Sequence, residues 1–184
     1  INASPAYDAG HAGDNVTVAV VDVAFDAENP EIADEVTETY PQSGSFQNVS
    51  GGHGTAVAEV VVDTAPNASL VLVDVGTGVG LYDAMDHLRE NTSTDVVVMS
   101  LSWYNAGPMD GSGAFNDRFE RSASNGLTWA VSAGNAGDGA HWNGTWTDPD
   151  GDDWLSVADG RELARVEGGT NVYMQWDDWP SGDE

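Results

Sequence analysis

The chain of 184 residues is long enough for one domain with a sizeable core and too short for two large ones. It has 31 acidic residues against five basic ones, all arginine, and a formal net charge of −26 that repels nucleic acids and anionic membranes and excludes both as expected partners. Because the acids are interspersed among periodic apolar segments and seven tryptophans, we exclude disorder and expect a folded protein adapted to concentrated salt, which screens self-repulsion.

Apolar runs predict strands at 16–23, 69–75, 95–102 and 127–135. The β-branched run at 16–23 further predicts a strand that is buried on both faces. Between these runs, apolar residues recur at helical spacing and predict helices at 55–63, 81–91 and 113–126. Strands that alternate with helices form βαβ units with right-handed crossovers. The sequence therefore predicts an α/β fold with a mostly parallel sheet and helices on both faces.

The pattern changes after Asn135. Residues 136–160 are rich in Gly, Asp and Trp, and parts of 161–179 alternate like antiparallel strands. We therefore expect a core at 1–135 and a separate β-rich element at 136–184. No apolar run reaches the roughly 18 residues of a membrane span, so we expect no membrane insertion.

Three polar residues fall at or near strand ends, where ligands meet an open parallel sheet. Asp22 directly follows TVAVV, Asn135 directly follows AVSAG, and His53 begins a helix after a glycine-rich approach. An aspartate close to this histidine would orient its ring as a base. A nearby asparagine could then donate a hydrogen bond to an oxyanion.

Four segments resemble, in order, the Asp, His, substrate-strand and Asn blocks of the subtilisin-like serine proteases. The segments are VAVVDVAFDAENPEI, GHGTAVAEVVVDTAPNASL, VVVMSLS and VSAGN. The resemblance implies that Asp22 holds the imidazole, that His53 is the general base and acid, and that Asn135 is the oxyanion donor. It also implies two walls of a peptide-binding cleft, one formed by Ser100, Leu101 and Ser102 and the other by Ser132, Ala133 and Gly134.

The chain departs from the family pattern at several positions. The GTSxAxP segment that carries the family's nucleophile does not occur in the sequence. Either that segment lies downstream of a truncated chain, which we expect, or the protein lacks a nucleophile. The second departure follows the aspartate, where Val23 and Ala24 replace the usual Ser or Thr and then Gly; Ser102 also replaces a common Gly.

The expected function is that of a halophilic, archaeal-type subtilisin-like serine endopeptidase in the full-length protein, with this N-terminal portion inactive alone. The alternative is a non-catalytic module that binds peptides or surfaces. The expected partner is an extended polypeptide substrate, and the sheet face left uncovered without the serine region could allow self-association.

We expect a secreted or cell-surface location. Six N-x-S/T sequons fit a glycosylated surface, although Asn and Ser/Thr crowding into turns would explain them too. No cofactor is expected to be required: the acids of 148–154 alternate as in a calcium loop but lack its closing Glu. His11, His87 and His141 have no motif context, and we expect them at the surface.

Overall fold

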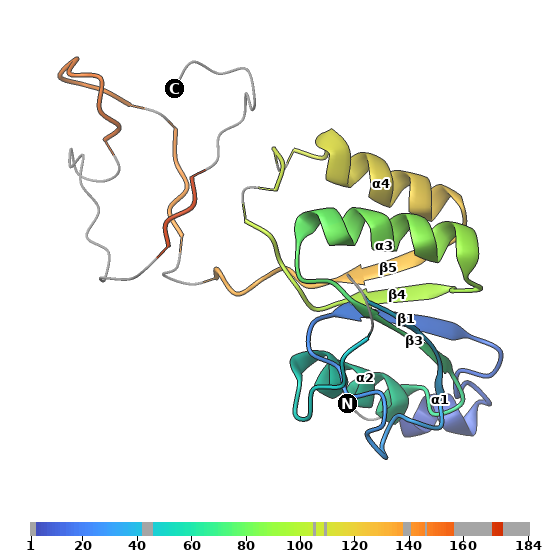
Figure 1. Ribbon diagram of the computed structural model, residues 1–184. Helices are drawn as coiled ribbons and strands as arrows, with labels where there is room; N and C mark the ends of the chain where they lie inside the picture. Colours follow the sequence, from blue (N-terminus) through green and yellow to red (C-terminus); the bar gives the residue numbers. More distant parts are fainter. Residues whose placement is uncertain are drawn as a thin grey trace. The chain divides into compact units, whose positions relative to one another are not determined.

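The computed structural model describes residues 3–41, 46–104, 106–108, 110–137, 141–145, 147–156 and 171–174. The chain divides into two compact units, with the boundary after Ala133; the second unit is Gly134–Met174. In the first unit, a five-stranded sheet has the order β2-β3-β1-β4-β5 (Figure 1). The strands are β1 (Thr17–Asp22), β2 (Val36–Tyr40), β3 (Ser69–Asp74), β4 (Val96–Met99) and β5 (Thr128–Val131).

Every strand pair in this sheet is parallel, and helices lie on both faces. Helix α2 (His53–Thr64) covers one face, while α3 (Gly78–Asn91) and α4 (Gly113–Ser124) lie on the other (Figure 1). A short helix, α1 (Ser4–Asp8), precedes β1. The predicted α/β class with a parallel sheet is confirmed.

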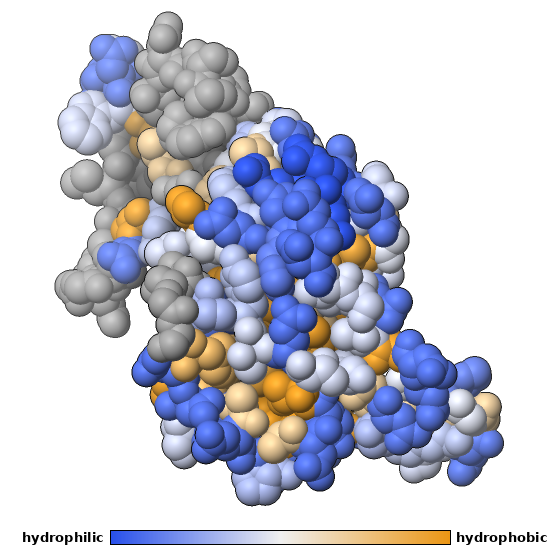
Figure 2. All heavy atoms as spheres, turned by 45° about the vertical axis from the view of Figure 1, so that its right-hand side comes forward, coloured by the Kyte–Doolittle hydropathy of each residue, from blue (hydrophilic) through white to orange (hydrophobic). Residues whose placement is uncertain are grey.

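Strand β1 is central and divides the core into two layers. Val18 and Val20 pack in the cluster beneath α2, whereas Ala19 and Val21 pack in the cluster beneath α3. Because both faces are covered, nearly every residue of this strand is buried, which explains its unbroken apolar run. The edge strand β5 is less well covered by the helices, and Val131 is 47% exposed. Figure 2 shows small groups of hydrophobic residues between the hydrophilic ones on the visible face.

Helix and strand ends differ from the predicted bounds by a few residues. Helix α3 begins at Gly78, ahead of the predicted start, because the Thr77 hydroxyl accepts a hydrogen bond from the Gly80 N–H at 3.1 Å. Helix α4 ends at Ser124, and Gly126 then adopts φ = +97°, so the predicted Asn-Gly stop is confirmed. Strands β4 and β5 are four residues each, shorter than predicted.

Two elements, α1 and β2, were not predicted. Strand β2 has the sequence VTETY, and its residues alternate between partly buried and exposed, as is typical of an edge strand. In the second unit, the described residues form no helix or strand. Most of the expected strands of 161–179 lie outside the described residues. Among those described, no helix is long and apolar enough to cross a bilayer.

Candidate active site

Asp22 and His53 meet at the carboxyl edge of the sheet. Asp22 is the last residue of β1 and His53 is the first residue of α2. The Asp22 Oδ1 and the His53 Nδ1 are 2.7 Å apart. The carboxylate is fully buried, whereas the histidine side chain is 56% exposed. A buried acceptor therefore fixes the ring through Nδ1, and among the described residues Nε2 has no hydrogen-bond partner.

The turn after Asp22 packs directly on the start of α2. The Gly54 N–H donates to the Val23 carbonyl at 2.9 Å, and the Asp26 N–H donates to the buried Thr55 hydroxyl at 2.7 Å. A Cβ added at Gly52 would lie 1.6 Å from the Ala24 carbonyl oxygen. The glycine before His53 is thus required by a backbone-to-backbone approach, which brings the two candidate catalytic residues together.

Val23 and Ala24, which stand where the family usually has Ser or Thr and then Gly, affect the hydrogen bonding of Asp22 and the backbone of the turn. Val23 donates its N–H to Asp22 Oδ1 at 2.7 Å but has no hydroxyl, and Asp22 Oδ2 is buried with no hydrogen-bond partner among the described residues. Ala24 has φ = +59°, in the left-handed region that favours glycine. The departures from the family pattern therefore coincide with an unpaired oxygen and a strained turn.

A second carboxylate that sequence reasoning missed lies beside the pair. Asp74 ends β3 as the register partner of Asp22. Burial raises the pKa of the Asp74 carboxyl, a hydrogen bond from the Ala24 N–H lowers it, and the negative charge of Asp22 raises it. The sequence carries a signal for this, because β1 and β3 both end in Val-Asp-Val. When two neighbouring parallel strands have aligned ends, the aspartates of these two motifs lie side by side.

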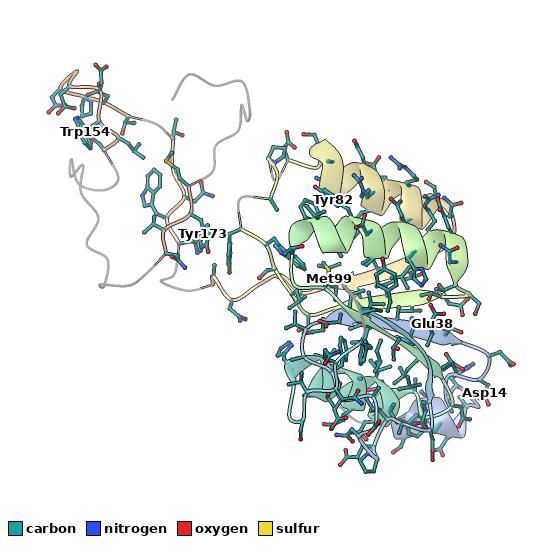
Figure 3. All side chains as sticks on the ribbon, viewed as in Figure 1. Asp14, Glu38, Tyr82, Met99, Trp154 and Tyr173 are labelled. Atoms are coloured by element: carbon teal, nitrogen blue, oxygen red, sulfur yellow. The ribbon has the colours of Figure 1, made fainter. Side chains whose placement is uncertain are left out.

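The predicted substrate-binding segments follow β4 and β5. Ser100, directly after Met99 (labelled in Figure 3), lines an open groove of about 370 Å³ together with His53. The rest of this groove is apolar and is formed by Ala56, Val57, Val60, Val61 and Val98. The structure thus brings one predicted wall residue to the same groove as the candidate base.

The two predicted walls are also joined to each other. The Ser132 hydroxyl donates to the Leu101 carbonyl at 3.1 Å, and the Ser132 N–H donates to the Met99 carbonyl at 3.0 Å. Ser102 and Ala133 continue the same two segments. Gly134 and Asn135 belong to the second unit, and their roles stay predictions.

His87 is partly exposed and makes contacts that the sequence did not predict. Its Nε2 lies 2.7 Å from Oε1 of Glu38, which is labelled in Figure 3, and its ring stacks on Tyr40 with the centroids 4.3 Å apart. Its side chain is 21% exposed. These contacts join α3 to β2, on the face of the sheet opposite α2, so His87 does not belong to the candidate site.

The acidic turn of the second unit brings Asp148, Asp150 and Asp152 together, with one carboxylate oxygen of each within 4.8 Å of the others. Asp148 accepts hydrogen bonds from the N–H groups of Asp153, Gly151 and Asp152, which lower the pKa of its carboxyl. These bonds explain the turn without an ion, and calcium binding stays a prediction.

Comparison with known proteins places this geometry in a family. The model of the subtilase family matches residues 13–164. Subtilisin E of Bacillus subtilis (strain 168) is 32% identical over 153 residues, which cover 74% of this chain and 39% of the relative. Subtilisin of Bacillus pumilus is 31% identical over the same share of this chain and 54% of its own length.

Solved structures agree in fold. The crystal structure of a cold adapted subtilisin-like serine proteinase has a TM-score of 0.55 at 24% identity, covering 68% of this chain and 48% of that one. The crystal structure of MycP1 with its N-terminal propeptide removed has a TM-score of 0.60 at 20% identity, and the match covers 90% of this chain and 55% of MycP1. The chain therefore spans about half the length, or less, of the proteins that it matches. Given the match along most of its residues, this chain belongs to the subtilase family.

Proposed function

We propose that this chain supplies the carboxylate and the general base of a halophilic subtilisin-like serine endopeptidase. The observation that carries the proposal is the 2.7 Å contact between the buried Asp22 carboxylate and the half-exposed His53 ring, at the carboxyl edge of a subtilase sheet. A buried carboxylate that accepts from Nδ1 leaves Nε2 free to act as a base. This is the orienter-and-base half of a serine protease triad.

In the proposed reaction, His53 Nε2 takes the proton of a serine hydroxyl as that oxygen attacks the scissile carbonyl, and later gives the proton to the leaving amine. The serine comes from polypeptide outside these 184 residues, because the sequence has no GTSxAxP segment. Asp22 stabilises the imidazolium that forms. Asn135 donates to the oxyanion, and the segments at Ser100–Ser102 and Ser132–Gly134 bind the substrate in extended form.

The chain by itself is inactive, since it holds the base without the nucleophile. Its net charge of −26 with no lysine supports adaptation to concentrated salt, as in halophilic archaea, and its sequons are consistent with export. Partly exposed valines in the groove beside His53, among them Val60 at 56% exposure, favour self-association of the isolated chain.

The test is hydrolysis of casein in multimolar KCl by the chain alone and by the chain joined to a subtilase segment that carries the serine. We expect no hydrolysis by the chain alone and measurable hydrolysis by the joined polypeptide, abolished by His53→Ala but not by His11→Ala. Casein binding without hydrolysis by a folded joined polypeptide would instead support the non-catalytic peptide-binding module. Hydrolysis by the chain alone that depends on His53 would overturn the claim of inactivity.

A further inference from the structure

Four N-x-S/T sequons of the first unit lie in the described part of the chain, and local structure accounts for three of their asparagines. Asn15 has φ = +60°, a left-handed conformation that asparagine adopts more readily than most residues. The Asn48 Oδ1 accepts a hydrogen bond from the Ala27 N–H at 3.0 Å. The Asn67 Nδ2 donates to Asp14 Oδ1 at 2.9 Å. At these three positions the turn itself explains the asparagine.

The fourth asparagine, Asn91, has no such role. It is the last residue of α3 and is exposed, and among the described residues its carboxamide has no hydrogen-bond partner. The helix end is instead held by Thr92, whose hydroxyl donates to the Leu88 carbonyl at 2.8 Å. Ser93, which completes the sequon, is also exposed and has no partner among the described residues. Both groups that define the sequon are therefore open to solvent.

Helix structure does not explain Asn91 either. Asparagine is common where a helix ends in a left-handed residue, but Asn91 still belongs to the helix, and Thr92 after it is extended, with φ = −123° and ψ = 167°. Inside a helix, asparagine is a weaker helix former than alanine. The neighbouring Arg89 is bound to Asp86 and Glu90, so it does not hold the Asn91 side chain. The carboxamide is thus available for a reaction.

Asn91 lies at the amino edge of the sheet, away from the candidate active site. Helix α3 leads from the carboxyl end of β3 to the amino end of β4. Four residues after Asn91, the Asp95 N–H donates to the Thr17 carbonyl at 2.9 Å, at the start of β1. Strands rise about 3.3 Å per residue, so the two ends of β1, Thr17 and Asp22, are roughly 16 Å apart. A large group on Asn91 would therefore leave His53 accessible.

We propose that Asn91 is a glycosylation site that takes an oligosaccharide from a lipid-linked sugar phosphate. The Asn91 Nδ2 forms a bond to the anomeric carbon of the sugar as the bond from that carbon to the phosphate oxygen breaks. The lipid phosphate leaves with the bonding electrons and takes up the proton that the amide loses. The Ser93 hydroxyl supplies the second group of the sequon. The inference rests on the exported location within the proposed function, but not on proteolysis.

The test expresses the chain with an export signal in a halophilic archaeon and analyses its peptides by mass spectrometry. Tryptic cleavage after Arg89 and Arg118 releases residues 90–118, in which Asn91 begins the one sequon. We expect this peptide to carry the mass of an oligosaccharide. Asn91→Gln should remove that mass, and so should Ser93→Ala, which keeps the asparagine but loses the hydroxyl. Ser93→Thr keeps the hydroxyl and should retain the sugar.

The matched control comes from the same molecules. Cleavage before Asp63 and Asp74 releases residues 63–73, which contain the sequon of Asn67. Because the Asn67 carboxamide is already bound to Asp14, we expect this peptide to carry no sugar. Equal modification of both peptides would show that local structure does not select the site, and would overturn the reasoning.

The proposal fails if the peptide 90–118 of the exported chain is unmodified in a host that glycosylates its own surface protein. Failure of the serine-bearing polypeptide to hydrolyse casein would count against the proposed function and leave the peptide masses unaffected. The two results are therefore distinguishable.

Discussion

Replacing Gly52 with alanine tests how His53 is brought to Asp22. The backbone of Gly52 has φ = −70° and ψ = 153°, which alanine adopts freely, so any effect is steric. The new Cβ would lie 1.6 Å from the Ala24 oxygen, and reaching even 3.0 Å requires a shift of about 1.4 Å between two backbones. A shift of that size takes a 2.7 Å hydrogen bond beyond hydrogen-bonding distance.

The expected cost combines two effects. Overpacking against backbone costs about 1–3 kcal/mol, and loss of the partner of the buried Asp22 carboxylate costs about 1–3 kcal/mol more. A loss of this size is a large part of the roughly 5–15 kcal/mol that stabilises a typical domain. We therefore expect Gly52→Ala to be among the most damaging single substitutions near the site.

Urea unfolding in multimolar KCl, followed by circular dichroism, measures this cost. Gly51→Ala is the matched control, because Gly51 has φ = +71° with no atom within 4 Å of a new Cβ. It should cost only the backbone strain, about 1–2 kcal/mol. It should also retain the low-field ¹H NMR signal of the His53 Nδ1–H, which reports the hydrogen bond to Asp22. If Gly52→Ala is no more destabilising than Gly51→Ala and retains that signal, the steric reasoning is wrong.

Three further predictions concern charge. Burial raises the pKa of the Asp74 carboxyl above its ordinary value of 3.8. The stability that its proton contributes is therefore complete below pH 3.8 and is lost as the pH rises through the raised pKa. Asp74→Asn removes this loss, so at neutral pH the variant should unfold at a higher urea concentration than the parent. His87→Ala should cost about 1 kcal/mol through its lost contacts with Glu38 and Tyr40, whereas His11→Ala should change the urea midpoint little; equal effects would contradict this assignment. Transfer from multimolar to millimolar KCl should unfold the chain, because its net charge of −26 is then unscreened, and an unchanged far-UV spectrum would refute salt adaptation.

The sequence predicted the buried elements better than the exposed ones. Strands β1 and β3 are covered on both faces, so their unbroken apolar runs indicated them directly. Strand β2 is an edge strand whose VTETY sequence has no such run. The contacts of His87 were missed for the same reason, since both of its partners, Glu38 and Tyr40, come from the strand that was not predicted.

At the candidate site, the order of the motifs predicted that Asp22 and His53 meet, and the structure adds the backbone and the second carboxylate around them. Asp22 and His53 were expected to meet, and they are in contact. The left-handed conformation of Ala24 could not be predicted from an alanine, which is rare there. Asp74 could have been inferred from the aligned Val-Asp-Val strand ends, but only with the strand order known, because β1 and β3 are not consecutive in the chain.

The central claim is that Asp22 orients His53 as the base of a serine endopeptidase. The most direct measurement is kcat/KM for a chromogenic peptide in multimolar KCl, for the chain joined to a serine-bearing subtilase segment and for its Asp22→Asn variant. Asparagine keeps the size of the side chain but favours the wrong tautomer of the imidazole, so we predict a loss of about 10⁴-fold. A variant that folds as the parent does and retains kcat/KM within a few-fold would contradict the account.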